Sequence, residues 1–134
     1  MYTGSCLCGG VTFEIDGELE SIQVCHCIQC RKAQGTAMAT NIPVAKSAFR
    51  LLSGADLLQG YESSPGKQRV FCRRCGSPIY SERVDGPGVV RIRAGILDGD
   101  LDVRPIAHFY TAYRANWWPV DDDLPRFEEG YVRR

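Results

Sequence analysis

The stretch that does most to decide the fold is Cys72-Arg73-Arg74-Cys75-Gly76. A Cys-x-x-Cys turn followed by glycine is typical of a zinc knuckle, in which two sulfurs converge and the glycine lets the backbone turn sharply. One such turn supplies two ligands, whereas a structural zinc site takes four. Cys72 and Cys75 therefore need two partners from elsewhere in the chain.

Two further cysteine groups precede this turn. The first is Cys6-Leu7-Cys8, and the second is Cys25-His26-Cys27-Ile28-Gln29-Cys30. Pairing the first group with the knuckle completes one four-thiolate site and leaves three thiolates with an open coordination position, which is the pattern of catalytic zinc. Taking two members of the second group instead would leave one cysteine of that group, and the pair Cys6 and Cys8, without a complete site. Counting ligands therefore favours the first partition.

Length and composition fit one small domain, 1–134, that buries a core of its own: the chain has 134 residues, of which 44% are hydrophobic. The net charge is zero, from 16 basic and 16 acidic residues, which argues against a nucleic-acid or anionic membrane partner. No apolar run approaches the roughly 20 residues that cross a bilayer. The N-terminus has neither a basic nor an apolar leader region, so we expect no signal peptide and a cytoplasmic location. Seven clustered cysteines in a reducing compartment indicate metal binding or redox chemistry, not disulfides.

Short alternating stretches separated by turn signals predict an all-β domain of antiparallel sheets. The expected strands lie at 11–15, 36–42, 70–72, 78–81, 90–93 and 106–110. Pro43 is expected to stop the second of them. In the last, Ile106, His108 and Tyr110 should share one face. Only 29–34 and 55–58 are expected to form helical turns.

Three motifs follow one another along the chain: Gly4-x-Cys6-x-Cys8-Gly9-Gly10-Val11, Cys25-His26-Cys27-x-x-Cys30-Arg31-x-x-x-Gly35 and Phe71-Cys72-x-x-Cys75-Gly76-Ser77. A fourth set lies near the C-terminus: Pro105-x-x-His108, Trp117-Trp118 and Asp123-Leu124-Pro125-x-Phe127. In this order and spacing, from Gly4 to about Tyr131, the chain resembles a short form of the glutathione-dependent formaldehyde-activating enzyme family, also called the centromere-protein-V/GFA domain family.

The resemblance implies antiparallel sheets around zinc, a fold known as a β-tent. It implies a structural Zn²⁺ on Cys6, Cys8, Cys72 and Cys75, and a second, catalytic and more labile Zn²⁺ on Cys25, Cys27 and Cys30. It also implies a carbon–sulfur lyase reaction in which S-(hydroxymethyl)glutathione reversibly gives glutathione and formaldehyde. Four arginines are candidates to meet a glutathione carboxylate: Arg91, Arg93, Arg104 and Arg114. Four cations beside the cysteines are candidates to offset the thiolate charge: Arg31, Lys32, Arg73 and Arg74.

Three functions follow from these patterns. The first is a zinc-dependent lyase, monomeric or homodimeric, that acts on a small thiol–aldehyde adduct. The second is a non-catalytic zinc module that binds a protein. A fourth ligand at the second site, from His26, His108 or a neighbouring chain, would favour it. On that view Trp117 and Trp118 would be a docking patch, although at least one is expected to pack into the core. The third is a thiol redox sensor.

Overall fold

The alternating residues at 11–15 form the centre of the protein's core. In the computed structural model, which describes residues 1–130, Val11, Phe13 and Ile15 are each at most 1% exposed. Phe13 and Ile15 lie on strand β2 (Thr12–Ile15), and the side chains between them stay partly accessible. The predicted strand at 11–15 is therefore confirmed, with its apolar residues facing the core.

Strand β2 is the middle strand of a small antiparallel sheet, between β1 (Tyr2–Ser5) and β5 (Phe49–Ser53). Gly4 of β1 stands directly opposite Phe13. A Cβ atom at Gly4 would overlap the Phe13 ring and would lie 2.9 Å from the carbonyl oxygen of Ile96. The absence of a side chain at Gly4 therefore lets the small sheet close over its largest buried residue.

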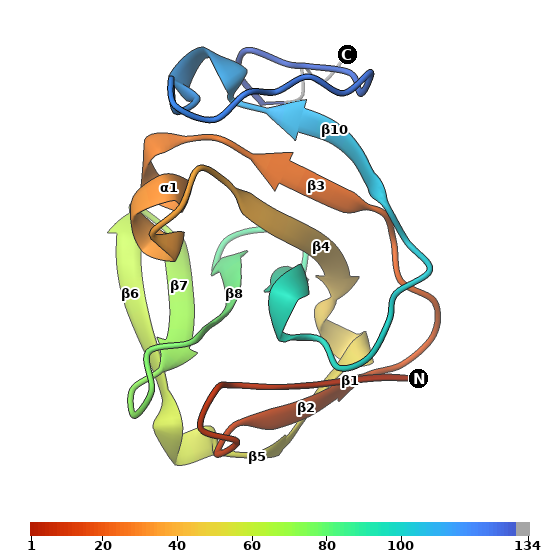
Figure 1. Ribbon diagram of the computed structural model, residues 1–134. Helices are drawn as coiled ribbons and strands as arrows, with labels where there is room; N and C mark the ends of the chain where they lie inside the picture. Colours follow the sequence, from red (N-terminus) through yellow and green to blue (C-terminus); the bar gives the residue numbers. More distant parts are fainter. Residues whose placement is uncertain (131–134) are drawn as a thin grey trace.

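The second sheet has seven strands in the order β10-β3-β4-β9-β8-β7-β6. Its strands are β3 (Ile22–Cys25), β4 (Ala39–Ala45), β6 (Leu58–Ser64), β7 (Lys67–Cys72), β8 (Pro78–Arg83), β9 (Val89–Arg93) and β10 (Pro105–Phe109). The sheet curves, so that β10 and β3 lie at one end and β7 and β6 at the other, with the three-stranded sheet along the bottom of the view (Figure 1). Buried apolar side chains from both sheets form one cluster, in which Ile42, Ile79 and Ile92 are fully buried.

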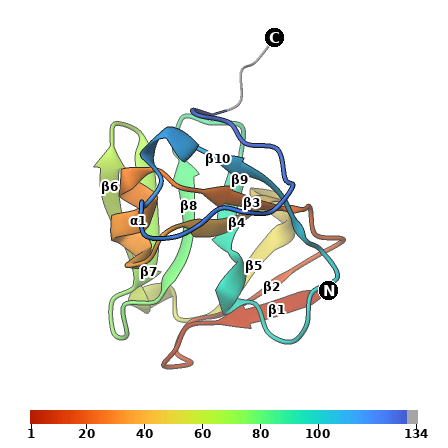
Figure 2. The same cartoon turned by 45° about the horizontal axis from the view of Figure 1, so that its top comes forward.

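The helix α1 (Ile28–Gln34) follows β3 and lies beside β6 and β7 (Figure 2). Gly35 ends it in the left-handed conformation, with φ of 65°. Short 3₁₀ turns at Lys46–Ala48, Ala55–Leu57, Ala94–Ile96 and Thr111–Tyr113 connect the strands. The predicted helical turns at 29–34 and 55–58 are thus confirmed, but the expectation that only these two stretches are helical is wrong, because three further 3₁₀ turns occur. No helix within residues 1–130 is long and apolar enough to cross a bilayer.

Strand β4 differs from its prediction, because it begins later and runs through Pro43 to Ala45. Pro43 pairs with Arg91 of β9, on one side of the strand. On the other side, β3 pairs with β4 only as far as Asn41. Beyond Asn41 that side is a free edge, where proline is tolerated because it has no ladder hydrogen bond to lose. The expectation that Pro43 stops the strand is therefore wrong.

The last strand adds the one parallel pair among the described strands, since β10 runs parallel to β3 while the other pairs are antiparallel. A register shift between Pro105 and Ala107 breaks the simple alternation. Ile106 is consequently exposed while His108 is buried, and the strand ends at Phe109. The expected common face of Ile106, His108 and Tyr110 is wrong for this reason. Residues 131–134 of the predicted 1–134 domain lie outside the described residues.

Candidate metal centres and the adjoining cleft

Four sulfurs converge where the loop after β1 meets the turn between β7 and β8. They belong to Cys6, Cys8, Cys72 and Cys75, and all lie within 4.8 Å of one another. The Cys6 and Cys8 sulfurs are 3.5 Å apart, and those of Cys8 and Cys72 are 3.8 Å apart. A tetrahedral zinc ion with bonds of about 2.3 Å holds its sulfurs about 3.8 Å apart. The cluster therefore has the size that such an ion needs, and the favoured partition of the cysteines is the one the structure adopts.

Polar neighbours favour the thiolate form of Cys8 and Cys75, whereas burial raises the pKa of Cys72. The hydrogen bond between Cys75 and Ser77, 3.3 Å long, lowers the pKa of Cys75 to about 5. The backbone N–H of Gly10, followed by the Arg74 guanidinium, lowers the pKa of Cys8. Metal ligation needs deprotonated sulfur, so these three contacts prepare Cys8 and Cys75 to bind a metal ion.

Arg74 is the one cation of the predicted four that contacts a sulfur among the described residues, since its Nε donates to Cys8 over 3.3 Å. Arg73 instead donates to the carbonyl of Asp56, and Arg31 to the carbonyl of Tyr113. The structure thus assigns charge compensation at this cluster to Arg74.

Three more sulfurs converge at the junction of β3 and α1. Cys25 ends β3, Cys27 is the N-cap of α1, and Cys30 lies in its first turn, with the three sulfurs within 4.8 Å of one another. The Cys27 sulfur also accepts the backbone N–H of Cys30 over 3.3 Å, so the sequence that starts the helix also gathers the thiols. No histidine, aspartate or glutamate within residues 1–130 joins this group.

Hydrogen bonds within the cluster shift the pKa values of Cys25 and Cys30 in opposite directions. Hydrogen bonds to Cys27 and Cys30 raise the pKa of Cys25, whereas hydrogen bonds to Cys25 and Cys27 lower the pKa of Cys30. Arg69 of β7 also favours the Cys30 thiolate, because its Nη1 lies 3.7 Å from that sulfur. Ser63 and Gln29 fix the rest of the Arg69 side chain, which is only 8% exposed.

Both histidines are buried, and they hydrogen-bond to each other and not to the sulfurs. His26 Nε2 lies 2.8 Å from His108 Nδ1, and His108 Nε2 lies 2.9 Å from the Asp122 carboxylate. An ionised carboxylate only accepts, so His108 Nε2 donates to Asp122; in a neutral His108 the Nδ1 atom then accepts from His26 Nε2. Burial lowers the pKa of His26 to about 4, which keeps it neutral in this chain. The histidines therefore connect the cysteine loop to the C-terminal segment.

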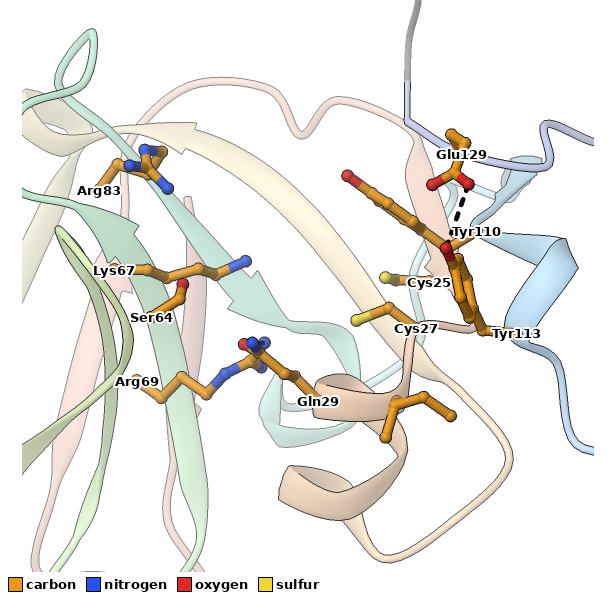
Figure 3. A pocket seen from close by; sticks show the side chains of 11 residues that line it. Cys25, Cys27, Gln29, Ser64, Lys67, Arg69, Arg83, Tyr110, Tyr113 and Glu129 are labelled. Carbon is orange, nitrogen blue, oxygen red and sulfur yellow. Dashed lines mark hydrogen bonds between the residues drawn. The ribbon is translucent and has the colours of Figure 1, made fainter.

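A cleft opens in front of the three-cysteine cluster. It has two lobes of about 390 and 380 Å³ that share Cys25, Lys67, Arg83 and Tyr110. Figure 3 shows the Cys25 and Cys27 sulfurs pointing into the cleft from one side and Lys67 pointing toward them from the other. The four-sulfur cluster, in contrast, lines neither lobe. Only the three-cysteine cluster therefore meets a space that a small molecule could enter.

The cationic wall of this cleft is largely a feature that sequence reasoning missed. Of the four predicted arginines only Arg91 lines it, while Arg93, Arg104 and Arg114 bond within the protein. The other cations come from β7 and β8, and they are Lys67, Arg69 and Arg83. The available signal was the alternation Lys67-Gln68-Arg69, which places two cations on one strand face.

Tyr110 is a second cleft residue that the sequence did not single out. Its backbone is left-handed, with φ of 57° and ψ of 39°, which is unusual for a residue other than glycine and concentrates at functional sites. Its hydroxyl points into the cleft (Figure 3). Burial, followed by the charges of Cys25 and Cys27, raises the pKa of Tyr110, so the phenol keeps its proton at neutral pH.

The two tryptophans both lie at the surface. Trp117 is 60% exposed and Trp118 is 52% exposed, so the expectation that one is a core residue is wrong. Trp118 lines a hollow of about 430 Å³ together with His108 and Asp122.

The fold and the clusters define a class of mostly β-sheet protein with one four-cysteine and one three-cysteine group, each able to hold a metal ion. Residues 1–113 match the family model described as glutathione-dependent formaldehyde-activating enzyme. The chain therefore belongs to this family.

Individual relatives agree with that assignment. A Halomonas elongata protein named "Putative glutathione-dependent formaldehyde-activating enzyme" is 29% identical over 90% of this chain and 82% of its own length. A Schizosaccharomyces pombe protein named as an uncharacterized lyase is 28% identical over 73% of this chain and 69% of its own. A crystal structure of a Rhodobacter sphaeroides protein superposes with a TM-score of 0.63 at 25% identity, covering 77% of this chain and 98% of that one.

Proposed function

We propose that this protein is a zinc-dependent carbon–sulfur lyase that cleaves and forms a small thiol–aldehyde adduct, such as S-(hydroxymethyl)glutathione. The observation that carries the proposal is the position of the three-cysteine cluster, which faces a cleft, whereas the four-cysteine cluster does not. The family model and the names of two relatives, a lyase and a formaldehyde-activating enzyme, support the reaction class.

The donor sets favour zinc at both clusters. Thiolate-only sets of four suit a structural zinc ion, and sets of three with a free position suit a catalytic one. Cys6, Cys8, Cys72 and Cys75 would hold the first ion, and Cys25, Cys27 and Cys30 the second. When bound, the second ion would supply a Lewis acid and would stabilise a substrate thiolate.

In the cleavage direction, the carbon–sulfur bond of the adduct breaks and its electron pair goes to sulfur. The hydroxyl proton leaves, the carbon–oxygen bond becomes the aldehyde carbonyl, and the sulfur ends as the thiol, so atoms and electrons balance without an oxidant. Arg69, which comes from the cationic wall of the cleft, would stabilise the Cys30 thiolate through its contact with that sulfur. Tyr110, which keeps its proton, lies where it would donate a hydrogen bond to the substrate oxygen.

Two alternatives make different predictions about the same cluster. A protein-binding zinc module would be favoured by a fourth ligand, and the described residues offer none. A redox sensor would leave the three thiols free of metal, so zinc analysis distinguishes it. A cytoplasmic location, one functional domain over 1–134 and a monomer or homodimer belong to the proposal as expectations.

Exchange spectroscopy by NMR tests the proposal, with glutathione and formaldehyde mixed with and without the protein. The zinc-loaded protein should accelerate exchange between the adduct and free glutathione. Cys27→Ser should abolish most of this acceleration. Serine is itself a good N-cap, so the variant removes the sulfur and keeps the start of α1. Equal exchange rates for Cys27→Ser and the unmodified protein would refute the proposed role of the cluster.

A further inference from the structure

The wall of the cleft opposite the cysteines carries positive charge without acidic partners inside the cleft. Lys67 and Arg83 are direct cross-strand neighbours on β7 and β8, and both line both lobes. The Lys67 ammonium group makes no hydrogen bond or ion pair with any residue in the described part of the chain. Among residues 1–130, the Arg83 side chain contacts Asp85, at 3.5 Å on the exposed rim, and the carbonyl of Pro65. Burial, followed by the charge of Arg69, lowers the pKa of Lys67.

These cations are not needed to neutralise the cysteine cluster directly. Arg69 already contacts the Cys30 sulfur, whereas neither Lys67 nor Arg83 hydrogen-bonds to a sulfur atom. The charges of Cys30 and Cys25 favour the Lys67 ammonium group only in part, because burial and the charge of Arg69 outweigh them and no carboxylate pairs with it. An anion entering the cleft would supply the missing negative charge.

The opposite wall has a different character. Tyr110, Tyr113 and Glu129 line it, and Glu129 accepts a hydrogen bond from the Tyr113 hydroxyl over 3.2 Å (Figure 3). Glu129 is the one acidic residue among the described residues that line the two lobes. It forms no ion pair with Lys67 or Arg83 within the described part of the chain. The positive wall therefore faces the cysteines across open space.

We infer that Lys67 and Arg83 are the specificity-determining residues of the cleft, and that they select thiols carrying a carboxylate by binding that carboxylate while the thiol sulfur lies at the three-cysteine cluster. The inference rests on the proposed function, because it assigns the rest of the same substrate. A carboxylate bound by an ammonium and a guanidinium group receives charge-assisted hydrogen bonds, which are stronger than neutral ones. A neutral thiol of the same length gains none of this.

A matched pair of probes tests the inference: 3-mercaptopropionate and its methyl ester, which carry the same thiol and differ in the free carboxylate. Dissociation constants are measured by calorimetry on the zinc-loaded protein under reducing conditions, for the unmodified chain, Lys67→Gln and Arg83→Gln. Lys46→Gln is the control, because it removes the same charge from an exposed lysine that pairs with Glu82 and lines neither lobe. Thermal unfolding of each variant checks that it is folded.

The unmodified protein should bind the acid at least about tenfold more tightly than the ester, as expected for charge-assisted contacts. This preference should fall to about threefold or less in Lys67→Gln and in Arg83→Gln, and it should persist in Lys46→Gln. Equal binding of acid and ester by the unmodified protein, or a preference that survives both cleft substitutions, would overturn the inference. A preserved preference together with no acceleration of adduct exchange would instead refute the lyase activity and leave the carboxylate selection standing.

Discussion

Tyr110 is the residue whose backbone departs most from its sequence pattern. The alternation around it predicts an extended residue, yet it turns left-handed directly after β10 and aims its hydroxyl into the cleft. A conformation that costs energy persists where surrounding contacts impose it, and here it places a proton donor beside the three-cysteine cluster.

Tyr110→Phe should therefore lower the rate of adduct exchange by on the order of 10²-fold, because it removes one hydrogen-bond donor to the reacting oxygen and little else. The melting temperature should stay close to that of the unmodified protein. Tyr61→Phe is the matched control, since Tyr61 is 66% exposed and lines neither cleft lobe. An unchanged exchange rate in Tyr110→Phe would exclude the phenol from the reaction.

The stability of the protein should depend on the ionisation of Asp122, and a substitution of this residue can isolate that contribution. Its hydrogen bond from His108, followed by the backbone N–H of Leu124, holds the pKa of Asp122 below the ordinary value of 3.8. Folding therefore favours the ionised form of Asp122. Its contribution to the free energy of unfolding is present above pH 3.8 and is lost as the pH falls through the lowered pKa. Asp122→Asn should unfold at a lower temperature than the unmodified protein at pH 7.

The difference between the two melting temperatures should then narrow as the pH is taken below 3.8. Both proteins lose metal together in acid, so the comparison is made at each pH and not across pH. A difference that stays constant from pH 7 to pH 3 would show that the Asp122 charge does not stabilise the His26–His108 connection.

At the scale of elements, the three-stranded sheet depends on Gly4, which has no side chain at the point where β1 comes closest to Phe13 of β2. Gly4 of β1 packs against Phe13 of β2, and both neighbours of the missing Cβ atom are fixed, one an interior ring and the other a backbone carbonyl. The same strand leads directly to Cys6, so its position decides whether the four sulfurs can meet.

Gly4→Ala should destabilise the protein by about 1–3 kcal/mol, the usual cost of overpacking a core. Gly95→Ala is the control, because no atom lies within 4 Å of a Cβ built there. Denaturant unfolding of the zinc-loaded proteins measures both. A loss at Gly4→Ala no larger than that at Gly95→Ala would mean that β1 shifts away from Phe13 at little cost.

At the scale of the whole molecule, the four-cysteine cluster joins the start of the chain to a turn some seventy residues later. Closing so long a loop restricts the unfolded chain, and structural zinc binding adds directly to the free energy of folding. Cys72→Ser should therefore lower the melting temperature far more than Cys27→Ser does. Similar melting temperatures for the two variants would contradict the division into a structural and an open cluster.

The sequence was sufficient for both clusters, because metal ligands must converge whatever the path of the chain between them. It was also sufficient for the apolar face of β2, where alternation and burial agree. The sequence was not sufficient where the structure depends on pairing between strands that are distant in the chain. The register of β7 against β8 brings Lys67 beside Arg83, the parallel β10 lies beside β3, and the free edge of β4 tolerates Pro43. Local sequence patterns do not predict these long-range contacts.

The central claim is that the three-cysteine cluster at the cleft holds its own zinc ion. Native mass spectrometry of protein purified with zinc under reducing conditions tests it most directly, by counting the ions bound to each folded chain. The account predicts two zinc ions in the unmodified protein and one in Cys27→Ser. A single zinc ion in both proteins would contradict it.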